Sequence, residues 1–251
     1  MLSEEKCSAV LQILEDNDIQ IACICETWFD SKEGKFSHNI KEAGYELIHG
    51  FRESKRGGGT AILYKNSLHV KPGEASSSLY LSFEFSFITI SSHTSKILLV
   101  CLYRKQEVAY RTFIEEIEKF TEGIFCKGDS IILMGDFNVW VDIPNNNEAT
   151  LLLDLMNGYG LSQMIACPTH RSGHTLDHVY MNEFQVDAEY EVLEAFGVSD
   201  HYPIIISVPN FKHLQKKQEI TYRKTKDINI DNMREDFKQS FEEIHNSVSD
   251  F

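Results

Sequence analysis

The chain has 251 residues, of which 42% are hydrophobic and 25% are charged. These proportions are ordinary for a globular protein and exclude global disorder, while the length permits one large domain or two small ones. The formal net charge of −14 gives no general attraction to nucleic acid. Contact with a phosphate backbone would therefore need local basic residues or a bound cation.

The cysteines and the N-terminal sequence indicate the compartment. The six cysteines form no CxxC pair, which favours core packing in a reducing compartment over disulfides or a zinc site. The N-terminus MLSEEKCSAVLQ is acidic and lacks the features of a secretory signal, and no apolar run reaches membrane length. We therefore expect an intracellular protein that does not associate with membranes, and the nucleus is compatible with this composition.

Hydrophobic periodicity predicts interleaved helices and strands. A first helix is expected over roughly the first sixteen residues, with Glu4 and Glu5 in its first turn. Two further helices are expected, one with Phe113, Ile117 and Phe120 on one face and one that begins in LLLDLMNGYG at 151–160 and ends on Asn157 and Gly158. Strands are predicted at 19–25, 60–64, 83–90, 96–103, 131–134, 176–182 and 202–208. The alternation FEFSFITI at 83–90 predicts a half-buried strand, and the interleaving indicates the α/β or α+β class.

The composition changes after Pro209. The segment KHLQKKQEITYRKTK at 212–226 is basic and polar, which predicts a linker. An amphipathic helix is expected beyond it, with apolar residues on one face at Met233, Phe237, Phe241 and Ile244. We predict one domain over 1–209 and a separate segment over 210–251, whose helix docks on the domain or on a protein partner.

The stretch ILMGDFNV at 132–139 raises the main question about function, because an apolar strand stops at once on Asp136 and Asn138. Gly135 permits a turn or a close approach of the backbone. In extended geometry Asp136 and Asn138 would share one face at the end of the strand. An α/β sheet presents polar groups to a ligand at such a place.

Other predicted strands also carry polar residues at their ends. Glu26 follows the strand in CICETW, Asp177 begins the strand in LDHVYMN, and Asp200 and His201 precede the strand in SDHYPIII. Each residue alone is equally well explained by a turn or a solvated strand end. Their coincidence at the ends of several strands predicts that they converge at one side of a sheet.

Metal-assisted phosphoryl hydrolysis would use such a set. Magnesium prefers oxygen ligands and is held by one or two carboxylates, a role that suits Glu26. Asp136 would position and deprotonate the attacking water, while Asn138 would hold the water or a phosphate oxygen. His201, made cationic and oriented by Asp177, would stabilise the growing charge on the phosphate. The four histidines at 170, 174, 178 and 201 are irregularly spaced, which disfavours a zinc site.

Five blocks occur in an order that resembles a known family: CICETW, LLVCLYRK, ILMGDFNV, THRSGHTLDHVYMN and VSDHYPIII. They are similar to the signature blocks of the endonuclease/exonuclease/phosphatase superfamily. The likeness is greatest to the apurinic/apyrimidinic-type endonuclease domains of non-LTR retrotransposons, where RGGGTAILYK at 56–65 also has a counterpart. The resemblance runs from about residue 10 to residue 208.

The resemblance implies a fold and an activity. The fold is a DNase I-like four-layer α/β sandwich, in which helices flank two packed mixed sheets. The activity is Mg²⁺-dependent nicking of DNA, with Mn²⁺ as the alternative cation.

The resemblance also implies a role for each matching residue. Glu26 and Asp200 are the expected metal ligands. The expected catalytic residues are Tyr103, Asp136, Asn138, Asp177 and His201. Arg171 and Thr169 fall in a loop expected to lie near DNA.

The chain departs from the family pattern before Glu26. Family members begin with a strand that carries an asparagine, and here Asn17 lies in a predicted turn instead, so we expect the first strand to be missing. The tyrosine block reads YRK rather than YRP. Two alternatives follow: a catalytically weak or inactive module that binds nucleic acid or protein, and an enzyme of the same fold that acts on RNA or on a small phosphodiester.

Overall fold

The computed structural model describes residues 4–29, 36–50, 57–73, 79–91, 96–125, 130–182, 188–194, 197, 199–208, 231–235 and 238–239. The chain divides into two compact units, Met1–Lys216 and Lys217–Phe251. In the second unit, residues 231–235 and 238–239 are helical. The predicted linker at 212–226 and most of the predicted apolar stripe, Phe237, Phe241 and Ile244, lie outside the described residues. The predicted boundary at residue 209 stays a prediction.

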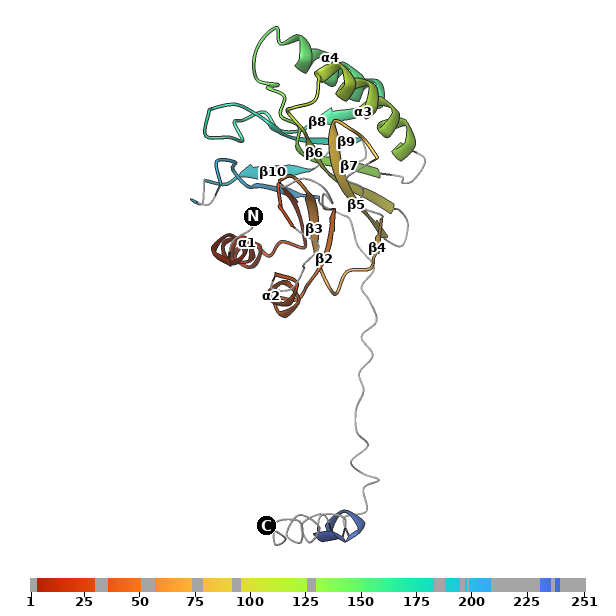
Figure 1. Ribbon diagram of the computed structural model, residues 1–251, viewed down its shortest axis with the longest axis vertical. Coiled ribbons are helices and arrows are strands. Elements are labelled where there is room, and N and C mark those ends of the chain that lie inside the picture. Colours follow the sequence, from red (N-terminus) through yellow and green to blue (C-terminus); the bar gives the residue numbers. More distant parts are fainter. Residues whose placement is uncertain are drawn as a thin grey trace. The chain divides into compact units, whose positions relative to one another are not determined.

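The first unit begins with a layer of two helices that covers a small sheet (Figure 1). The helices are α1 (Glu4–Asp16) and α2 (Phe36–Glu42). The sheet is antiparallel throughout and has the order β1 (Ile21–Cys25), β3 (Thr60–Lys65), β2 (Tyr45–Gly50). Among the described strands, β1 pairs with β3 only.

A larger sheet packs against the small one, and two helices lie on its outer side (Figure 1). Its strand order is β4 (Val70–Pro72), β5 (Phe83–Ser91), β6 (Lys96–Arg104), β7 (Ser130–Asp136), β9 (Asp177–Asn182), β8 (Leu161–Gln163). The pair β6 and β7 is parallel and the other pairs are antiparallel. The outer helices are α3 (Tyr110–Phe125) and α4 (Asn147–Gly158), and a separate two-stranded sheet consists of β10 (Glu189–Val192) and β11 (Ile204–Ser207).

Three apolar clusters hold the four layers together. The first lies between the larger sheet and its helices and contains Phe83, Phe113 and Phe137. The second lies between the two sheets and contains Ile62 and Leu99. The third joins α1 and α2 to the small sheet and centres on Leu14, Ile40, Tyr45, Ala61 and Leu63. Burial of apolar surface in three successive interfaces is the dominant favourable term for such a layered domain.

The α/β sandwich expected from the sequence is confirmed. The half-buried strand predicted at 83–90 is found only in the second half of β5, where burial alternates from Phe87 onward. In the first half Glu84 and Ser86 on one face are as buried as Phe83 and Phe85 on the other. The polar face of β5 packs against the small sheet, where Ser86 Oγ lies 2.8 Å from Thr60 Oγ1. The elements that periodicity did not predict are mostly short, namely α2, β2, β4, β8 and β10.

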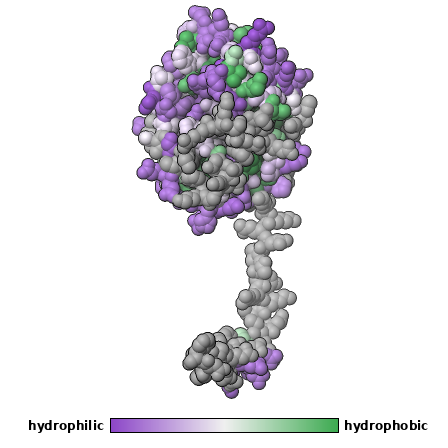
Figure 2. All heavy atoms as spheres, viewed as in Figure 1, coloured by the Kyte–Doolittle hydropathy of each residue, from purple (hydrophilic) through white to green (hydrophobic). Residues whose placement is uncertain are grey.

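The surface of the first unit is mainly hydrophilic on the face shown in Figure 2, with scattered hydrophobic side chains. None of the helices in the described part of the chain is both long enough and apolar enough to cross a membrane. The few large hydrophobic side chains that are strongly exposed include Leu79, Leu81 and Leu151 and both tryptophans, Trp28 and Trp140.

We expect Gly135→Ala to destabilise the protein strongly. Gly135 has φ +141°, and a Cβ atom there would lie 2.0 Å from the backbone oxygen of Leu102 on the neighbouring strand. Strain and overpacking of this kind each cost about 1–3 kcal/mol. Urea unfolding measures the loss in free energy of unfolding.

The matched control is Gly123→Ala in α3, where a Cβ atom meets nothing within 4 Å. Alanine is the better helix former by about 0.5–1 kcal/mol, so this variant should be slightly more stable than the wild type. Equal stability of the two variants would contradict the close approach of β6 and β7.

Candidate active site

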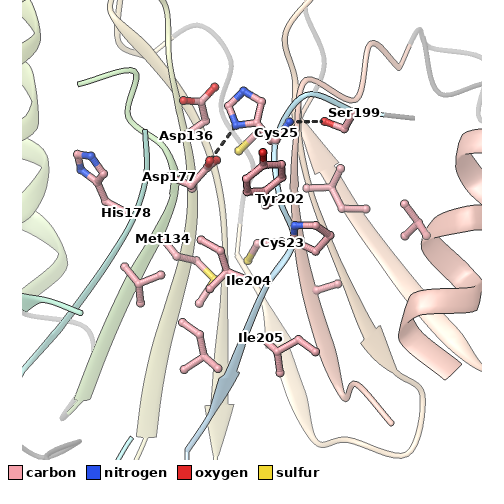
Figure 3. Close-up of a pocket in the computed structure, with 18 of the residues that line it drawn as sticks. Cys23, Cys25, Met134, Asp136, Asp177, His178, Ser199, Tyr202, Ile204 and Ile205 are labelled. Carbon is pink, nitrogen blue, oxygen red and sulfur yellow. Dashed lines mark hydrogen bonds and ion pairs between the residues drawn. The ribbon is translucent and has the colours of Figure 1, made fainter. Parts of the chain in front are cut away.

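Strand register brings three of the predicted residues together at one edge of the larger sheet. In the pairing of β6, β7 and β9, Tyr103 lies opposite Asp136, and Asp136 lies opposite Asp177. Because β7 ends where β9 begins, their carboxylates extend from the same edge. Figure 3 shows Asp136 and Asp177 side by side on these two strands.

Asp136 is buried and is held by the residue two positions further along the chain. One carboxylate oxygen accepts the backbone N–H of Asn138 at 3.0 Å, and the other accepts the Asn138 amide at 3.2 Å. The same amide donates to the backbone oxygen of Arg104 at 2.9 Å, and Gln106 donates to Asn138 Oδ1. Asn138 therefore positions the carboxylate of Asp136 in this structure.

The sequence predicted that Asp136 and Asn138 share one face because they are alternate residues of an extended strand. The structure brings the two side chains together in another way. Asn138 has φ +52°, in the left-handed region, so the segment is not extended at this point. Non-glycine residues adopt such angles at a cost of about 1–3 kcal/mol and are often found at functional sites. The turn, rather than strand alternation, brings the amide to the carboxylate.

His201 is bound to Asp177, as the sequence predicted. His201 Nδ1 lies 2.8 Å from Asp177 Oδ2, a contact that appears as a dashed line in Figure 3. The ligand atoms of Asp136, Asp177 and His201 all lie within 4.8 Å of one another. The backbone N–H of His201 donates to Ser199 Oγ at 3.0 Å, which fixes the start of the segment leading to β11.

The charges of this cluster shift two pKa values upward. Burial raises the pKa of Asp136, and the negative charges of Asp177 and Glu26 add to the effect, so that it reaches about 7 despite the opposing charge of His201. Burial alone would lower the pKa of His201. The hydrogen bond and charge of Asp177, with the charges of Asp136 and Asp200, outweigh burial and raise it to about 9. At neutral pH His201 is therefore an imidazolium.

Glu26 approaches the cluster from the small sheet, directly after β1. Its side chain is exposed, and the Tyr103 hydroxyl donates to Glu26 Oε1 at 2.6 Å. Glu26 and Trp28 have φ values of +55° and +54°, which makes this a second segment of unusual backbone at the site. Tyr103 thus links the predicted metal ligand on one sheet to the catalytic strand ends of the other.

A glycine turn and a buried glutamate hold the segment after Glu26. The N–H groups of Thr27 and Trp28 donate to the oxygens of Gly59 and Gly58 at 3.3 and 2.8 Å. The Gly59 N–H in turn donates to Glu84 Oε2 at 2.5 Å, and Glu84 is 1% exposed. Glu84 was not among the residues predicted from the sequence. The sequence shows only an acidic residue within an alternating apolar strand, and such a residue is equally typical of the solvent-facing side of the strand.

The remaining predicted residues are Asp200, Arg171 and Thr169. Asp200 Oδ2 lies 3.3 Å from His170 Nε2, and the His170 ring packs edge-on against His201. Arg171 is exposed, and its backbone N–H donates to the oxygen of Asp200. Thr169 is fully buried, and its Oγ1 accepts the N–H groups of Leu176 and Asp177, both at 3.0 Å. In this structure Thr169 positions Asp177.

One cleft of about 1660 Å³ is lined by most of the predicted residues, namely Glu26, Asp136, Asn138, Arg171, Asp177, Asp200 and His201, whereas Tyr103 and Thr169 lie behind its lining. Asp136, Asp177 and His201 stand at one end, and Figure 3 shows that the cleft continues past Cys23 and Met134 to Ile204 and Ile205. The apolar part lies between β1 and β11. Two other histidines are occupied elsewhere, since His178 is fully buried with Nε2 at 2.9 Å from the oxygen of Val139, and His174 binds Asp142.

The donor set fits a hard divalent cation. The side chains that could reach the polar end of the cleft from the two sheets, Glu26, Asp136 and Asp177, offer carboxylate oxygens, the ligands that Mg²⁺ prefers. Burial is the main cause of the raised pKa of Asp136, and the negative charges of Asp177 and Glu26 add to it, so a bound cation would relieve this part of the shift. Cys25 also lines the cleft, and its contact with Cys101, together with burial, raises its thiol pKa, which disfavours a thiolate ligand.

The sequence matches the Endonuclease/Exonuclease/phosphatase family over residues 7–201. The chain belongs to this family. The matched region spans every predicted site residue from Glu26 to His201. No curated protein matches the chain in sequence.

Solved structures with the same fold include three nucleic-acid enzymes. The 3′ phosphatase NExo from Neisseria bound to a product DNA hairpin has a TM-score of 0.63, 16% identity, and coverage of 82% of this chain and 95% of that chain. The endonuclease domain of TRAS1, a telomere-specific non-LTR retrotransposon, has a TM-score of 0.61, 18% identity, and coverage of 80% and 91%. An AP endonuclease from Archaeoglobus fulgidus has a TM-score of 0.61, 16% identity, and coverage of 81% and 94%. At these identities the likeness shows the fold of this family member.

The ion pair of His201 and Asp177 generates a prediction about pH. Because the pKa of His201 is raised to about 9, its contribution to stability is complete below its ordinary pKa of about 6.5 and is lost as the pH rises through 9. In Asp177→Asn the carboxylate is absent, so the pKa of His201 should fall toward the ordinary value. NMR titration of the imidazole measures both values, and an unchanged pKa in the variant would contradict the assignment of its cause.

The turn at Gly59 generates a second prediction. A Cβ atom on Gly59 would lie 2.6 Å from Thr27 Oγ1 and 3.0 Å from the oxygen of Gly50, so Gly59→Ala should displace the segment that carries Glu26. Gly44→Ala is the matched control, because Gly44 has a similar φ of +83° and nothing within 4 Å. We expect Gly59→Ala to lose about 1–3 kcal/mol more than the control in urea unfolding. Equal losses would show that the contact with Thr27 does not hold the segment.

Proposed function

We propose that the protein is a Mg²⁺-dependent phosphodiesterase that nicks DNA and leaves a 3′ hydroxyl, and that it derives from the endonuclease of a non-LTR retrotransposon. Mn²⁺ is the expected alternative cation. The observation that carries the proposal is the cluster of Asp136, Asp177 and His201, in which a cationic histidine and a carboxylate with a pKa near 7 face the same space.

The cluster has one group for each requirement of phosphodiester hydrolysis. His201 can stabilise negative charge on the phosphate, and Asp136 can accept a proton from water. Asp177 binds His201 at Nδ1, which leaves Nε2 to donate a hydrogen bond to a phosphate oxygen as negative charge grows there. Asp136 has a pKa near neutrality and is therefore matched to accept a proton from the attacking water. Asn138 and Tyr103 keep the carboxylates of Asp136 and Glu26 in place.

A cation would be held by Glu26, beside the carboxylates of Asp136 and Asp177. Asp200, the second ligand that the resemblance suggests, contacts His170 in this structure. When bound, Mg²⁺ would supply positive charge to the phosphate oxygens. The other predicted substrate contacts remain Arg171, which is exposed beside the cluster, and Thr169, which acts through Asp177.

The choice of DNA is supported by relatives of the same fold. The Neisseria enzyme is bound to a DNA hairpin, and the other two structures are an endonuclease domain of a retrotransposon and an AP endonuclease. The order of the five sequence blocks supports the retrotransposon type in particular. RNA and small phosphodiesters are the competing substrates.

A nicking assay on supercoiled plasmid tests the proposal. We expect Mg²⁺-dependent conversion to open circles, loss of activity with EDTA, and nicks that a DNA polymerase extends without prior treatment. Asp136→Asn and His201→Ala should each lower the rate by at least about 100-fold. The first variant removes the group that accepts a proton from water, and the second removes the cation that stabilises negative charge on the phosphate.

Matched controls separate catalysis from contamination and from loss of folding. Asp154→Asn changes an exposed acid on α4, and His38→Ala changes an exposed histidine on α2, so both should retain full activity. Equal nicking by wild type and Asp136→Asn would sink the proposal. Absence of nicking with either cation, in a folded protein that still binds DNA, would instead identify a binding module, and faster cleavage of RNA would reassign the substrate.

A further inference from the structure

Both tryptophans of the chain are exposed and line the catalytic cleft. Trp28 is 42% exposed and Trp140 is 46% exposed, and each lies two residues beyond a predicted catalytic or metal-binding residue, Glu26 or Asn138. Tryptophan is highly buried on average in folded proteins. Two exposed indoles at one cleft therefore indicate a surface that a ligand covers.

The indole of Trp140 is held rigidly from one side. His174 stacks on it with ring centroids 4.7 Å apart and an interplanar angle of 18°. His174 Nδ1 lies 2.8 Å from Asp142 Oδ2, and the other oxygen of Asp142 accepts the N–H of Thr175 at 2.9 Å. Asp142 thus fixes the histidine, and the histidine supports one face of the indole. The rest of the indole stays available to a second planar group.

Trp28 is fixed by its backbone and by the glycine turn. Its N–H donates to the oxygen of Gly58, and its φ of +54° directs the chain away from the strand. A Cβ atom on Gly57 would lie 3.8 Å from the indole, so the glycine turn passes close to the ring system. Both indoles are therefore preorganised, which lowers the entropy cost of covering them with a ligand.

The charged side chains of the cleft do not favour binding of a nucleic acid through its phosphates. The lining carries the acidic side chains Asp18, Glu26, Asp136, Asp177 and Asp200 and the cationic side chains Lys6, Arg104, Arg171 and His201. Arg104 is buried and donates to the backbone oxygen of Asn138 at 3.0 Å. The cleft as a whole therefore has no net positive charge that would attract an extended phosphate backbone, whereas stacking of a base on an indole does not depend on charge and contributes about 1–3 kcal/mol per base.

We propose that Trp140, together with Trp28, forms a stacking platform for unpaired nucleobases next to the phosphate that is cleaved. This inference rests on the proposed nuclease function and narrows its substrate to nucleic acid with bases free of duplex stacking. A base inside a duplex is covered on both faces, so only an unpaired base can lie on the indole. The small phosphodiesters without a base are then poor substrates.

Tryptophan fluorescence tests the platform directly, because the chain has two tryptophans only. In Trp28→Phe the signal comes from Trp140 alone, and in Trp140→Phe it comes from Trp28 alone. The probe is a single-stranded oligothymidylate of about eight nucleotides, added in EDTA so that binding is measured without cleavage. The matched control probe has the same phosphates with an abasic tetrahydrofuran in place of every base.

We expect oligothymidylate to quench both single-tryptophan variants and the abasic probe to quench neither. Trp140→Ala should weaken oligothymidylate binding roughly 5- to 150-fold, from the energy of one stacked base, whereas Leu151→Ala, which removes an exposed side chain on α4, should not. In the nicking reaction Trp140→Ala should raise KM more than it lowers kcat. Binding should also fall little between low and moderate salt.

Equal quenching by the two probes, or unchanged binding by Trp140→Ala, would overturn the platform. The two proposals fail separately. Quenching by bases in a protein that never cleaves DNA would leave the platform standing as a binding surface and refute the nuclease. Cleavage with an unchanged KM in Trp140→Ala would keep the nuclease and refute the platform.

Discussion

The register of three neighbouring strands is the constraint on which the site depends. Because β6, β7 and β9 pair without a slip, Tyr103, Asp136 and Asp177 stand in one row across the edge of the larger sheet. A shift of one residue would turn a side chain to the opposite face. The close approach at Gly135, which no other residue type permits, lets β6 and β7 meet immediately before that row.

The charges of the site follow from this row and from its burial. Carboxylates from both sheets face one another, and one histidine with a raised pKa partly compensates them. An acidic protein thus contains a local arrangement that suits a cation and a phosphate, although its overall charge of −14 does not attract nucleic acid. Local geometry, and not net charge, defines which ligand the cleft can accept.

The sequence predicted the strands that carry the site, because each combines an apolar run with an abrupt polar end. It also predicted the contact of His201 with Asp177, through the likeness of the blocks. It did not predict the left-handed turn at Asn138 or the buried position of Glu84. Turn conformation depends on contacts with distant residues such as Arg104, and burial depends on the second sheet that covers β5. Short elements such as α2 and β8 carry too few residues for a period to emerge.

Because β1 has a hydrogen-bonded neighbour on one side only within the described part of the chain, the two sheets hold their carboxylates with different rigidity. Asp136 ends a strand with hydrogen-bonded neighbours on both sides, whereas Glu26 follows a strand that pairs with β3 only within the described part of the chain. Amide groups at such an edge exchange with solvent through local opening that costs less than global unfolding. The carboxylate contributed by the small sheet is thus the more adaptable of the pair, and the larger sheet provides the fixed template to which it adjusts.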